Sequence, residues 1–284
     1  MRIYITTLLF SLMCTTISAN DFDDVEIKVT KANENIYMLQ GAGGNIGVLA
    51  TKTGLLLVDN QFAPLAERIE NAMKEIANKE LKYIVNTHFH GDHTGSNSYF
   101  SHKAPIFAHE NVRTRLSNQD KDKQVALPVV TYENGINIYL ADEQITLSHF
   151  PAAHTDGDTI VFFNKANVLH TGDLFFEAGF PYVDLKNGGT VKGYLAAVNK
   201  IIAEIPDDVI IIPGHGNLTN KAKYQTFADM ISYSIKHVST LLAAGKSEQE
   251  ILTIGIGKAY QHFSWSFITE EKWLKTLITD LKTN

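Results

Sequence analysis

Four metal-binding side chains occur within six residues of this sequence, in the stretch His-x-His-x-Asp-His at positions 88–93. His88 and His90 are two residues apart, so at the end of a strand their side chains project to the same side. The glycine that follows lets the backbone turn, which brings Asp92 and His93 back toward the same point. Imidazole nitrogens and carboxylate oxygens are donors for zinc and related metals. A polar loop with incidental histidines is the alternative, but the chain has 11 histidines in 284 residues, so we predict a metal site.

Three further donors each lie just beyond the C-terminal end of an apolar stretch that predicts a strand. They are His154 after residues 144–150, Asp173 after residues 167–171 and His215 after residues 209–212. Taken singly, each would more often be a structural polar residue. Three repeats of a strand followed by a donor are more specific, because sites are commonly built where rigid strands end. We therefore expect these residues to join the motif.

The N-terminal half alternates predicted strands and helices around the motif. Alternating apolar and polar residues at 25–29 predict a half-buried strand, and the apolar run at 81–85 predicts the buried strand that delivers the histidines. Apolar residues at three- and four-residue steps predict a helix at 63–78, and another is expected near 94–100. The glycine-rich segment 41–47 is followed by strand, so we interpret it as tight turns beside the site rather than a nucleotide-binding loop.

The C-terminal half ends in helices. These are predicted at 190–205, near 220–243, at 247–254 and at 269–282. The chain contains no repeat or linker that divides it. A strand-rich segment followed by a helical segment occurs twice along the chain. This order indicates two similar halves packed face to face.

Two of the remaining features have two possible roles each. Asp59 ends an apolar strand and would either cap a helix or turn or accept a hydrogen bond from a metal-bound imidazole. The aromatic segment 175–182 would line a substrate pocket or pack in the core, and the charged segment 118–127 predicts a solvated loop. The remaining histidines lack neighbouring donors and are not predicted to be ligands: His102, His109, His149, His170, His237 and His262.

The first 19 residues have the pattern of a secretory signal peptide. A basic Arg2 is followed by an apolar run, and Ala19 ends a plausible cleavage site. The run is too short for a stable membrane anchor, so we expect residues 20–284 to form one periplasmic or secreted domain with a C-terminal helical extension. Cys14 is the only cysteine, so the mature chain would have neither a disulfide nor a thiolate ligand. The net charge of −6 gives no sign of nucleic-acid binding, and nothing in the sequence predicts an oligomeric state.

The motifs, taken in order, resemble those of the metallo-β-lactamase superfamily. The resemblance covers about residues 25–220 and rests on Asp59, the motif at 88–93, His154, Asp173 and His215. It implies an α/β fold, a four-layer αβ/βα sandwich in which helices flank two mixed β-sheets. The metals would lie between the sheets at one edge.

The resemblance also implies a binuclear hydrolase. One metal would be held by His88, His90 and His154 and the second by Asp92, His93 and His215, with Asp173 as the bridge. Three imidazoles suit zinc, and we expect two zinc ions per chain, although without a thiolate the donors also suit iron or manganese. A metal-bound hydroxide would attack a carbonyl, with Asp92 orienting it and passing a proton.

The expected substrate is a small molecule with an ester, thioester, lactone or lactam bond. In the best-known β-lactamase subclass a cysteine stands where this chain has Asp173, and a substrate-binding lysine where it has Phe176. The bridging aspartate is typical of the wider hydrolase branch. A class B-like β-lactamase and a catalytically silent metal-binding module are the alternatives. A redox di-iron protein is disfavoured because related proteins usually have glutamate at the position of His90.

Overall fold

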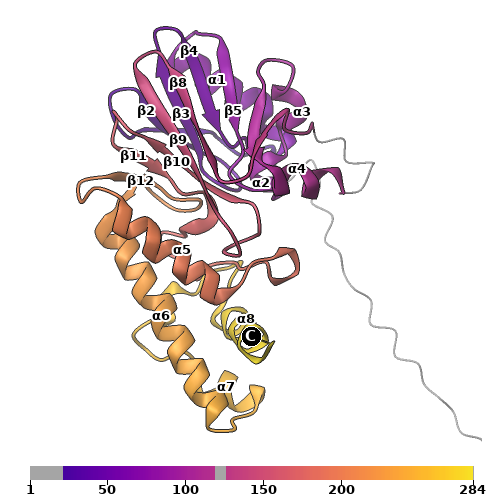
Figure 1. Cartoon of the computed structure of the whole chain (residues 1–284), viewed down its shortest axis with the longest axis vertical. Helices are drawn as coiled ribbons and strands as arrows, with labels where there is room; N and C mark the ends of the chain where they lie inside the picture. Colours follow the sequence, from indigo (N-terminus) through magenta and orange to yellow (C-terminus); the bar gives the residue numbers. More distant parts are fainter. Residues whose placement is uncertain (1–21, 119–125, 284) are drawn as a thin grey trace, which may run out of the picture.

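The computed structural model describes residues 22–118 and 126–283. Two mixed β-sheets stack face to face, and helices cover their outer faces (Figure 1). The predicted four-layer αβ/βα sandwich is confirmed. The signal-peptide prediction for residues 1–19 and most of the charged segment at 118–127 lie outside the described residues.

The first sheet has seven strands in chain order, β1 to β7. Its first four strands are antiparallel, and β4, β5, β6 and β7 run parallel to one another. The strands are β1 (Lys28–Lys31), β2 (Ile36–Gln40), β3 (Ile46–Thr51), β4 (Gly54–Val58), β5 (Leu81–Val85), β6 (Ile106–His109) and β7 (Val130–Tyr132). The predicted first strand at 25–29 is therefore displaced, and only its last two residues belong to β1.

The second sheet has six strands in the order β13-β12-β11-β10-β9-β8. Strands β11 and β12 are parallel, and all other neighbours are antiparallel. The strands are β8 (Gly135–Leu140), β9 (Glu143–Phe150), β10 (Asp158–Phe163), β11 (Val168–His170), β12 (Ile210–Ile212) and β13 (Thr219–Asn220).

Each predicted helical segment contains a helix, and one of these segments is divided into two. They are α1 (Ala66–Ile76), α2 (Gly91–Thr94), α3 (Asn97–Phe100), α4 (Glu110–Ser117), α5 (Val191–Glu204), α6 (Lys221–Ala243), α7 (Glu248–Ile254) and α8 (Glu270–Thr283). The helix expected near 94–100 is two short helices, and Asp92 lies inside α2, whose N-cap is His90. Within the described residues, none of these helices combines the length and apolar character needed to span a bilayer.

The described residues form four buried apolar clusters, and the three larger ones hold the layers together. Alternate residues of a strand face opposite sides of its sheet, so in β4 Leu57 packs against α1 while Leu56 packs between the sheets. Strand β12 divides likewise: Ile212 faces the first sheet and Ile211 faces α5 and α6. The continuous apolar runs in these strands are thus explained by burial on both faces.

Candidate metal centre

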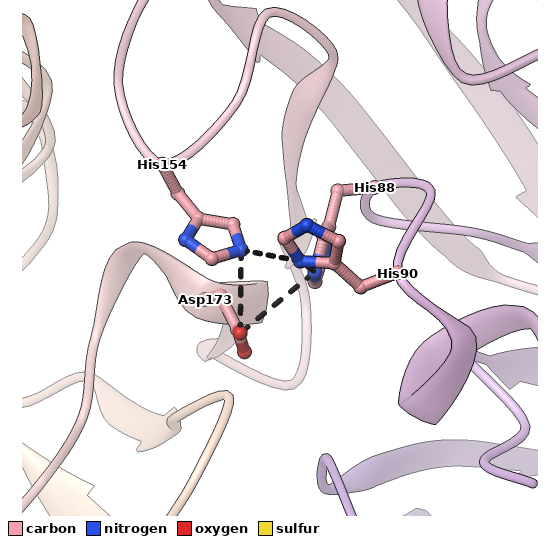
Figure 2. Close-up of side chains that lie close together, drawn as sticks. All are labelled: His88, His90, His154 and Asp173. Carbon is pink, nitrogen blue, oxygen red and sulfur yellow. Dashed lines mark hydrogen bonds and ion pairs between the residues drawn. The ribbon is translucent and has the colours of Figure 1, made fainter. Parts of the chain in front are cut away.

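The first group of donors consists of three imidazoles and a carboxylate that converge on one point (Figure 2). His90 Nδ1 lies 3.1 Å from His88 Nε2 and 2.9 Å from His154 Nε2. Asp173 Oδ2 closes the group at 3.4 Å from His154 Nε2. His88 and His154 are fully buried, as is most of Asp173.

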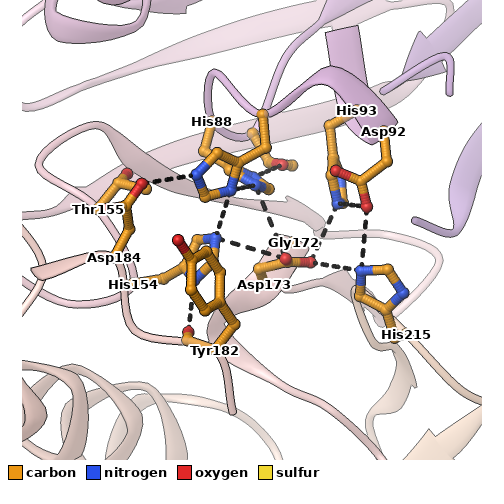
Figure 3. Close-up of polar contacts among 12 residues, drawn as sticks. His88, Asp92, His93, His154, Thr155, Gly172, Asp173, Tyr182, Asp184 and His215 are labelled. Carbon is orange, nitrogen blue, oxygen red and sulfur yellow. Dashed lines mark hydrogen bonds and ion pairs between the residues drawn. The ribbon is translucent and has the colours of Figure 1, made fainter. Parts of the chain in front are cut away.

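The second group lies beside the first and contains Asp92, His93 and His215. His215 Nε2 is 3.4 Å from Asp92 Oδ2, and His93 Nε2 is 3.6 Å from the same oxygen. Asp173 Oδ1 lies 3.1 Å from His93 Nε2 and 3.4 Å from His215 Nε2. Asp173 therefore faces both groups, one oxygen toward each (Figure 3). All seven residues singled out from the sequence are brought together.

Strand ends explain this convergence. The motif follows β5, and His154, Asp173 and His215 lie beyond the ends of β9, β11 and β12. Asn45 joins the two sheets at this edge: its amide nitrogen donates to Gly214 O at 2.7 Å and its side chain to Pro213 O at 2.9 Å. The two sheets thus present their donors to one shared space.

The glycine-rich turn packs directly against the site, as predicted. A Cβ atom on Gly44 would lie 2.2 Å from the ring of His93, and one on Gly43 would lie 2.7 Å from the Cβ of Asp92. Gly43 also has a positive φ of 94°. Side chains at these positions would displace the donors, so glycine is required here by close approach.

The outward ring nitrogens of His90, His93 and His154 have hydrogen-bond partners of their own. His154 Nδ1 donates to Tyr182 O at 2.7 Å, and His93 Nδ1 donates to Asp59 Oδ2 at 2.7 Å. His90 Nε2 donates to Asp184 Oδ2 at 3.0 Å. In a neutral imidazole, a proton on the outward nitrogen leaves a lone pair on the inward one. These partners therefore orient the rings as ligands.

For Asp59 the structure decides between the two readings. Its carboxylate accepts hydrogen bonds from Thr87 N at 2.8 Å and Thr87 Oγ1 at 2.7 Å, in addition to the one from His93. The residue is fully buried and has a φ of 60°. Asp59 thus supports a donor of the second group and does not cap a helix.

A chain of hydrogen bonds behind His90 was not predicted from the sequence. Asn187 Nδ2 donates to Asp184 Oδ2 at 2.6 Å, and Arg115 Nη1 donates to Asn187 Oδ1 at 2.8 Å. Arg115 is itself held by Asp156 through two hydrogen bonds. Burial raises the pKa of Asp184, but hydrogen bonds from His90 and Asn187 outweigh it and lower the pKa to about 2. Asp184 is therefore a permanently charged acceptor.

The two groups differ in their electrostatics. Burial lowers the pKa of His154 to about 4, and burial together with the neighbouring His93 lowers that of His88 well below its usual value. In the second group burial is outweighed by carboxylates: Asp173, Asp92 and Asp59 raise the pKa of His93. Asp173 and Asp92 raise that of His215 to about 9. His88 and His154 of the first group thus offer neutral imidazoles, and the second group favours positive charge.

Two unsatisfied atoms test whether metal ions fit this site. His93 Nε2 and Asp173 Oδ1 are buried and have no hydrogen-bond partner among the described residues, although they lie only 3.1 Å apart. When His93 is neutral and its proton is directed at Asp59, a lone pair faces a carboxylate oxygen, and the raised pKa of His93 shows that positive charge is favoured at this point. A cation between them resolves this conflict. The two His/Asp groups are consistent with a binuclear metal site.

A pocket of about 970 Å³ opens onto the metal centre. Among its lining residues are six aromatic side chains, Phe62, Phe89, Phe176, Tyr182, Trp265 and Phe267. The aromatic segment at 175–182 divides between the two roles considered for it. Phe176 and Tyr182 line the pocket, and Phe176 stacks on His215 with ring centroids 5.1 Å apart. Phe175 and Phe180 are fully buried in the core beneath α5 and α6.

The remaining histidines lie outside both donor groups. His170 is buried in β11, where Nε2 bonds Asn45 O at 3.1 Å and so helps to join the sheets. His109 and His149 stack on each other with centroids 3.6 Å apart. The donor groups found among the described residues include none of the six histidines set aside from the sequence.

Comparison with known proteins decides the family. The model of the metallo-beta-lactamase superfamily matches residues 39–215, more than half of the chain. The chain belongs to this superfamily. It is a metal-dependent hydrolase of that fold, and the match ends at His215, the last of the donors.

Individual relatives are distant. A probable hydroxyacylglutathione hydrolase of Schizosaccharomyces pombe is 29% identical over 203 residues, which are 67% of this chain and 71% of that protein. The metallo-beta-lactamase IND-1 of Chryseobacterium indologenes is 25% identical over 221 residues, covering 75% and 90%. The sec-alkylsulfatase Pisa1 of Pseudomonas sp. shares the fold with a TM-score of 0.72 at 14% identity, over 89% of this chain and 50% of that one.

Proposed function

We propose that this protein is an exported binuclear zinc hydrolase that cleaves a carbonyl ester, thioester or lactone bond of a small molecule. The observation that carries the proposal is the orientation of the donors. Imidazoles whose outer nitrogens are bonded to Asp59, Asp184 and Tyr182 O turn their lone pairs toward two adjacent points. A pocket with six aromatic side chains in its lining opens onto these points.

His88, His90 and His154 would hold one ion, and Asp92, His93 and His215 the other, with Asp173 shared between them. Two such ions supply an activated water and an electrophile for a substrate carbonyl. Among the metal ligands, Asp92 is placed to accept the proton of the attacking water, since it lines the pocket and its side chain is 25% exposed. Burial raises its pKa, but His93 and His215 outweigh burial and lower it, so Asp92 Oδ2 is an ionised acceptor at neutral pH.

Asp173 and one relative favour an ester or thioester over a β-lactam. The relative named a hydroxyacylglutathione hydrolase matches at 29% identity, and its name denotes hydrolysis of an acyl-glutathione. β-Lactam hydrolysis is the second candidate, because the β-lactamase IND-1 aligns with three quarters of the chain. Phe176 stacks on His215 and stands at the position of the substrate-binding lysine of the best-known β-lactamase subclass. Its uncharged ring cannot pair with the carboxylate of a β-lactam.

A hydrolysis screen tests the proposal. The purified protein, loaded with zinc, would be assayed against thioesters, aryl esters, lactones and nitrocefin while its metal content is measured. We expect about two ions per chain and turnover of at least one ester, thioester or lactone. Turnover of nitrocefin alone would replace the proposal with the β-lactamase candidate, and a fully loaded protein inactive on every substrate would refute both.

Export is a separate part of the proposal and is supported by the basic, apolar and small-residue pattern of residues 1–19. Mass spectrometry of protein recovered from the periplasm or medium should give an N-terminus at Asn20. A chain that stays in the cytoplasm and begins at Met1 would contradict it.

A further inference from the structure

The segment that follows His215 builds one wall of the pocket over the metal centre. Its contributions are Trp265, Phe267, Ile268, Lys272, Lys275 and Thr276. The superfamily match ends at residue 215, so this wall belongs to the C-terminal helical part, α6 to α8, that lies beneath the sandwich in Figure 1. The superfamily match therefore gives no information about the substrate that this wall would select.

The wall is fixed against the sandwich by its aromatic rings. Trp265 Nε1 donates to Phe180 O at 3.0 Å, and a Cβ on Gly179 would lie 2.7 Å from the Trp265 ring. The ring of Phe267 packs edge-on against Tyr182 with centroids 5.6 Å apart. Phe267 remains 51% exposed, so a large apolar surface faces the pocket instead of the core.

Lys272 holds a positive charge at this wall. Its Nζ donates to Phe267 O at 2.7 Å and lies 5.2 Å from the centroid of the Phe267 ring. Among the described residues no carboxylate lies within 4.0 Å of it, whereas Lys275 is paired with Glu271 at 2.5 Å. An ammonium group has three N–H donors, and the protein accepts one of them. Lys272 can therefore bind an anionic acceptor in the pocket.

The other charged groups of the pocket are already matched. Asp184 accepts hydrogen bonds from His90 and Asn187, and Asp92 and Asp173 face the histidines of the metal centre. The pocket thus combines aromatic walls, metal ligands at one end and an uncompensated cation on α8. Charge complementarity selects against a cationic substrate and favours an anionic one.

We propose that the substrate is an amphipathic anion, whose apolar body lies between Trp265, Phe267 and Phe62 and whose anionic group is bound by Lys272. The scissile carbonyl would then lie at the metal centre. This inference rests on the proposed function for the reaction, but the anion site itself does not depend on which bond is cleaved. It makes the C-terminal extension the element that determines substrate specificity.

Kinetics on a matched pair of substrates tests the role of Lys272. The pair consists of two aryl esters of one long acyl chain, which ends either in a carboxylate or in the neutral carboxamide. We expect the zinc-loaded parent to prefer the carboxylate about three- to tenfold in kcat/KM, mainly through KM, as a partly exposed charge pair allows. Lys272→Met should abolish this preference, so kcat/KM on the carboxylate should fall about three- to tenfold more than kcat/KM on the carboxamide. Lys282→Met, on the same helix outside the pocket, should keep it.

A binding measurement separates this inference from the proposed reaction. Calorimetry would compare naphthalene-2-sulfonate with the neutral methyl naphthyl sulfone, using the zinc-loaded parent and the variants Lys272→Met, Lys282→Met and Lys275→Met. We expect Lys272→Met to weaken sulfonate binding about three- to tenfold and to leave sulfone binding unchanged. If no carbonyl substrate is cleaved but this difference is found, the proposed function fails and the anion site stands. Equal loss in Lys282→Met, a preference lost in Lys275→Met instead, or no preference in the parent would overturn the inference.

Discussion

The two donor groups lie side by side and share Asp173, yet they offer a metal ion opposite environments. The first group combines buried imidazoles whose pKa values at His88 and His154 are lowered mainly by burial. The second places His93 and His215 among carboxylates that raise their pKa values. Their exposure also differs: His154 is fully buried, while Asp92 and His215 are 25% and 23% exposed.

This difference assigns different tasks to the two groups. The buried imidazoles of His88 and His154 are neutral, so they need not release a proton when a metal binds. This suits tight and permanent metal binding. The second group faces the pocket and is rich in oxygen donors, which suits weaker binding and exchange of protons with a substrate. We therefore expect changes in the second group to affect chemistry and changes in the first to affect metal retention.

The strongest test of this division is Asp92→Asn. Asparagine keeps an oxygen for the metal but cannot accept a proton at neutral pH, so we expect kcat/KM at saturating zinc to fall about 10²–10⁴-fold, as for loss of a general base. Metal content should remain close to that of the parent. Circular dichroism controls for folding, and a variant within threefold of the parent would remove Asp92 from the mechanism.

Lowering the pH should separate the groups by their affinity for metal. In the metal-free protein the pKa of His215 is about 9, so its ring is protonated at neutral pH and a metal must displace that proton. The pKa of His93 is raised as well, so affinity at the second group should fall at least about tenfold per pH unit as the pH is lowered, or at least about a hundredfold from pH 8 to 6. His154, with a pKa of about 4, is already neutral over this range.

Competition with a chelator at several pH values would measure this difference. We expect the second ion to be lost first as the pH falls, with one ion retained at pH 6. Simultaneous loss of both ions, at the same pH, would show that the two groups behave as one site.

Asp59→Asn should weaken the second group because asparagine has a single acceptor oxygen. If that oxygen accepts from Thr87 N, the NH2 group faces His93 Nδ1 and cannot accept its proton. Asparagine tolerates the left-handed backbone at this position, where φ is 60°. Loss of an outer hydrogen-bond partner typically costs about 10–100-fold in metal affinity, and we expect this at the second ion only. Titration of the metal-free variant with Co²⁺, followed by its absorption spectrum, would report the two sites separately. An equal loss at both sites would argue against the division.

The matched change in the first group is Asn187→Ala, which should have the smallest effect. It removes one hydrogen bond from Asp184 and leaves the bond between Asp184 and His90 in place. We expect affinity for the first ion to fall only a few-fold, since one residue still separates the change from the ligand. The same Co²⁺ titration would detect it, and a larger effect at the second ion would contradict the proposed path through His90.

The sequence predicts the donors better than their surroundings. Strand patterns and the spacing of the motif are local, and they placed His154, Asp173 and His215 correctly beyond strand ends. Asp184 lies in an irregular loop and meets His90 across 94 residues of chain, so no periodic pattern announces it. Trp265 and Phe267 were missed for the same reason, because they lie in a segment between helices with no regular repeat.

Contacts between distant parts of the chain also explain why two predicted element boundaries differ from the observed ones. Residues 25–27 alternate like a strand, but Arg68 donates hydrogen bonds to Phe22 O and Val25 O, which holds the chain away from the sheet until Lys28. The expected helix near 94–100 is divided because Gly95 packs against the segment at Gln61 and Phe62, where a Cβ would come within 2.9 Å of Gln61 O. Tertiary contacts override local propensity at both places.

The joining of the sheets at Asn45 also sets the order in which the centre assembles. His88, His90, Asp92 and His93 follow β5 of one sheet, whereas the other three donors follow strands of the second. A folding intermediate with a single sheet formed would hold an incomplete set of ligands and bind metal weakly. We expect metal capture to coincide with the final docking of the sheets, after the transition state for folding. Removing the metal should then speed unfolding and leave the folding rate nearly unchanged.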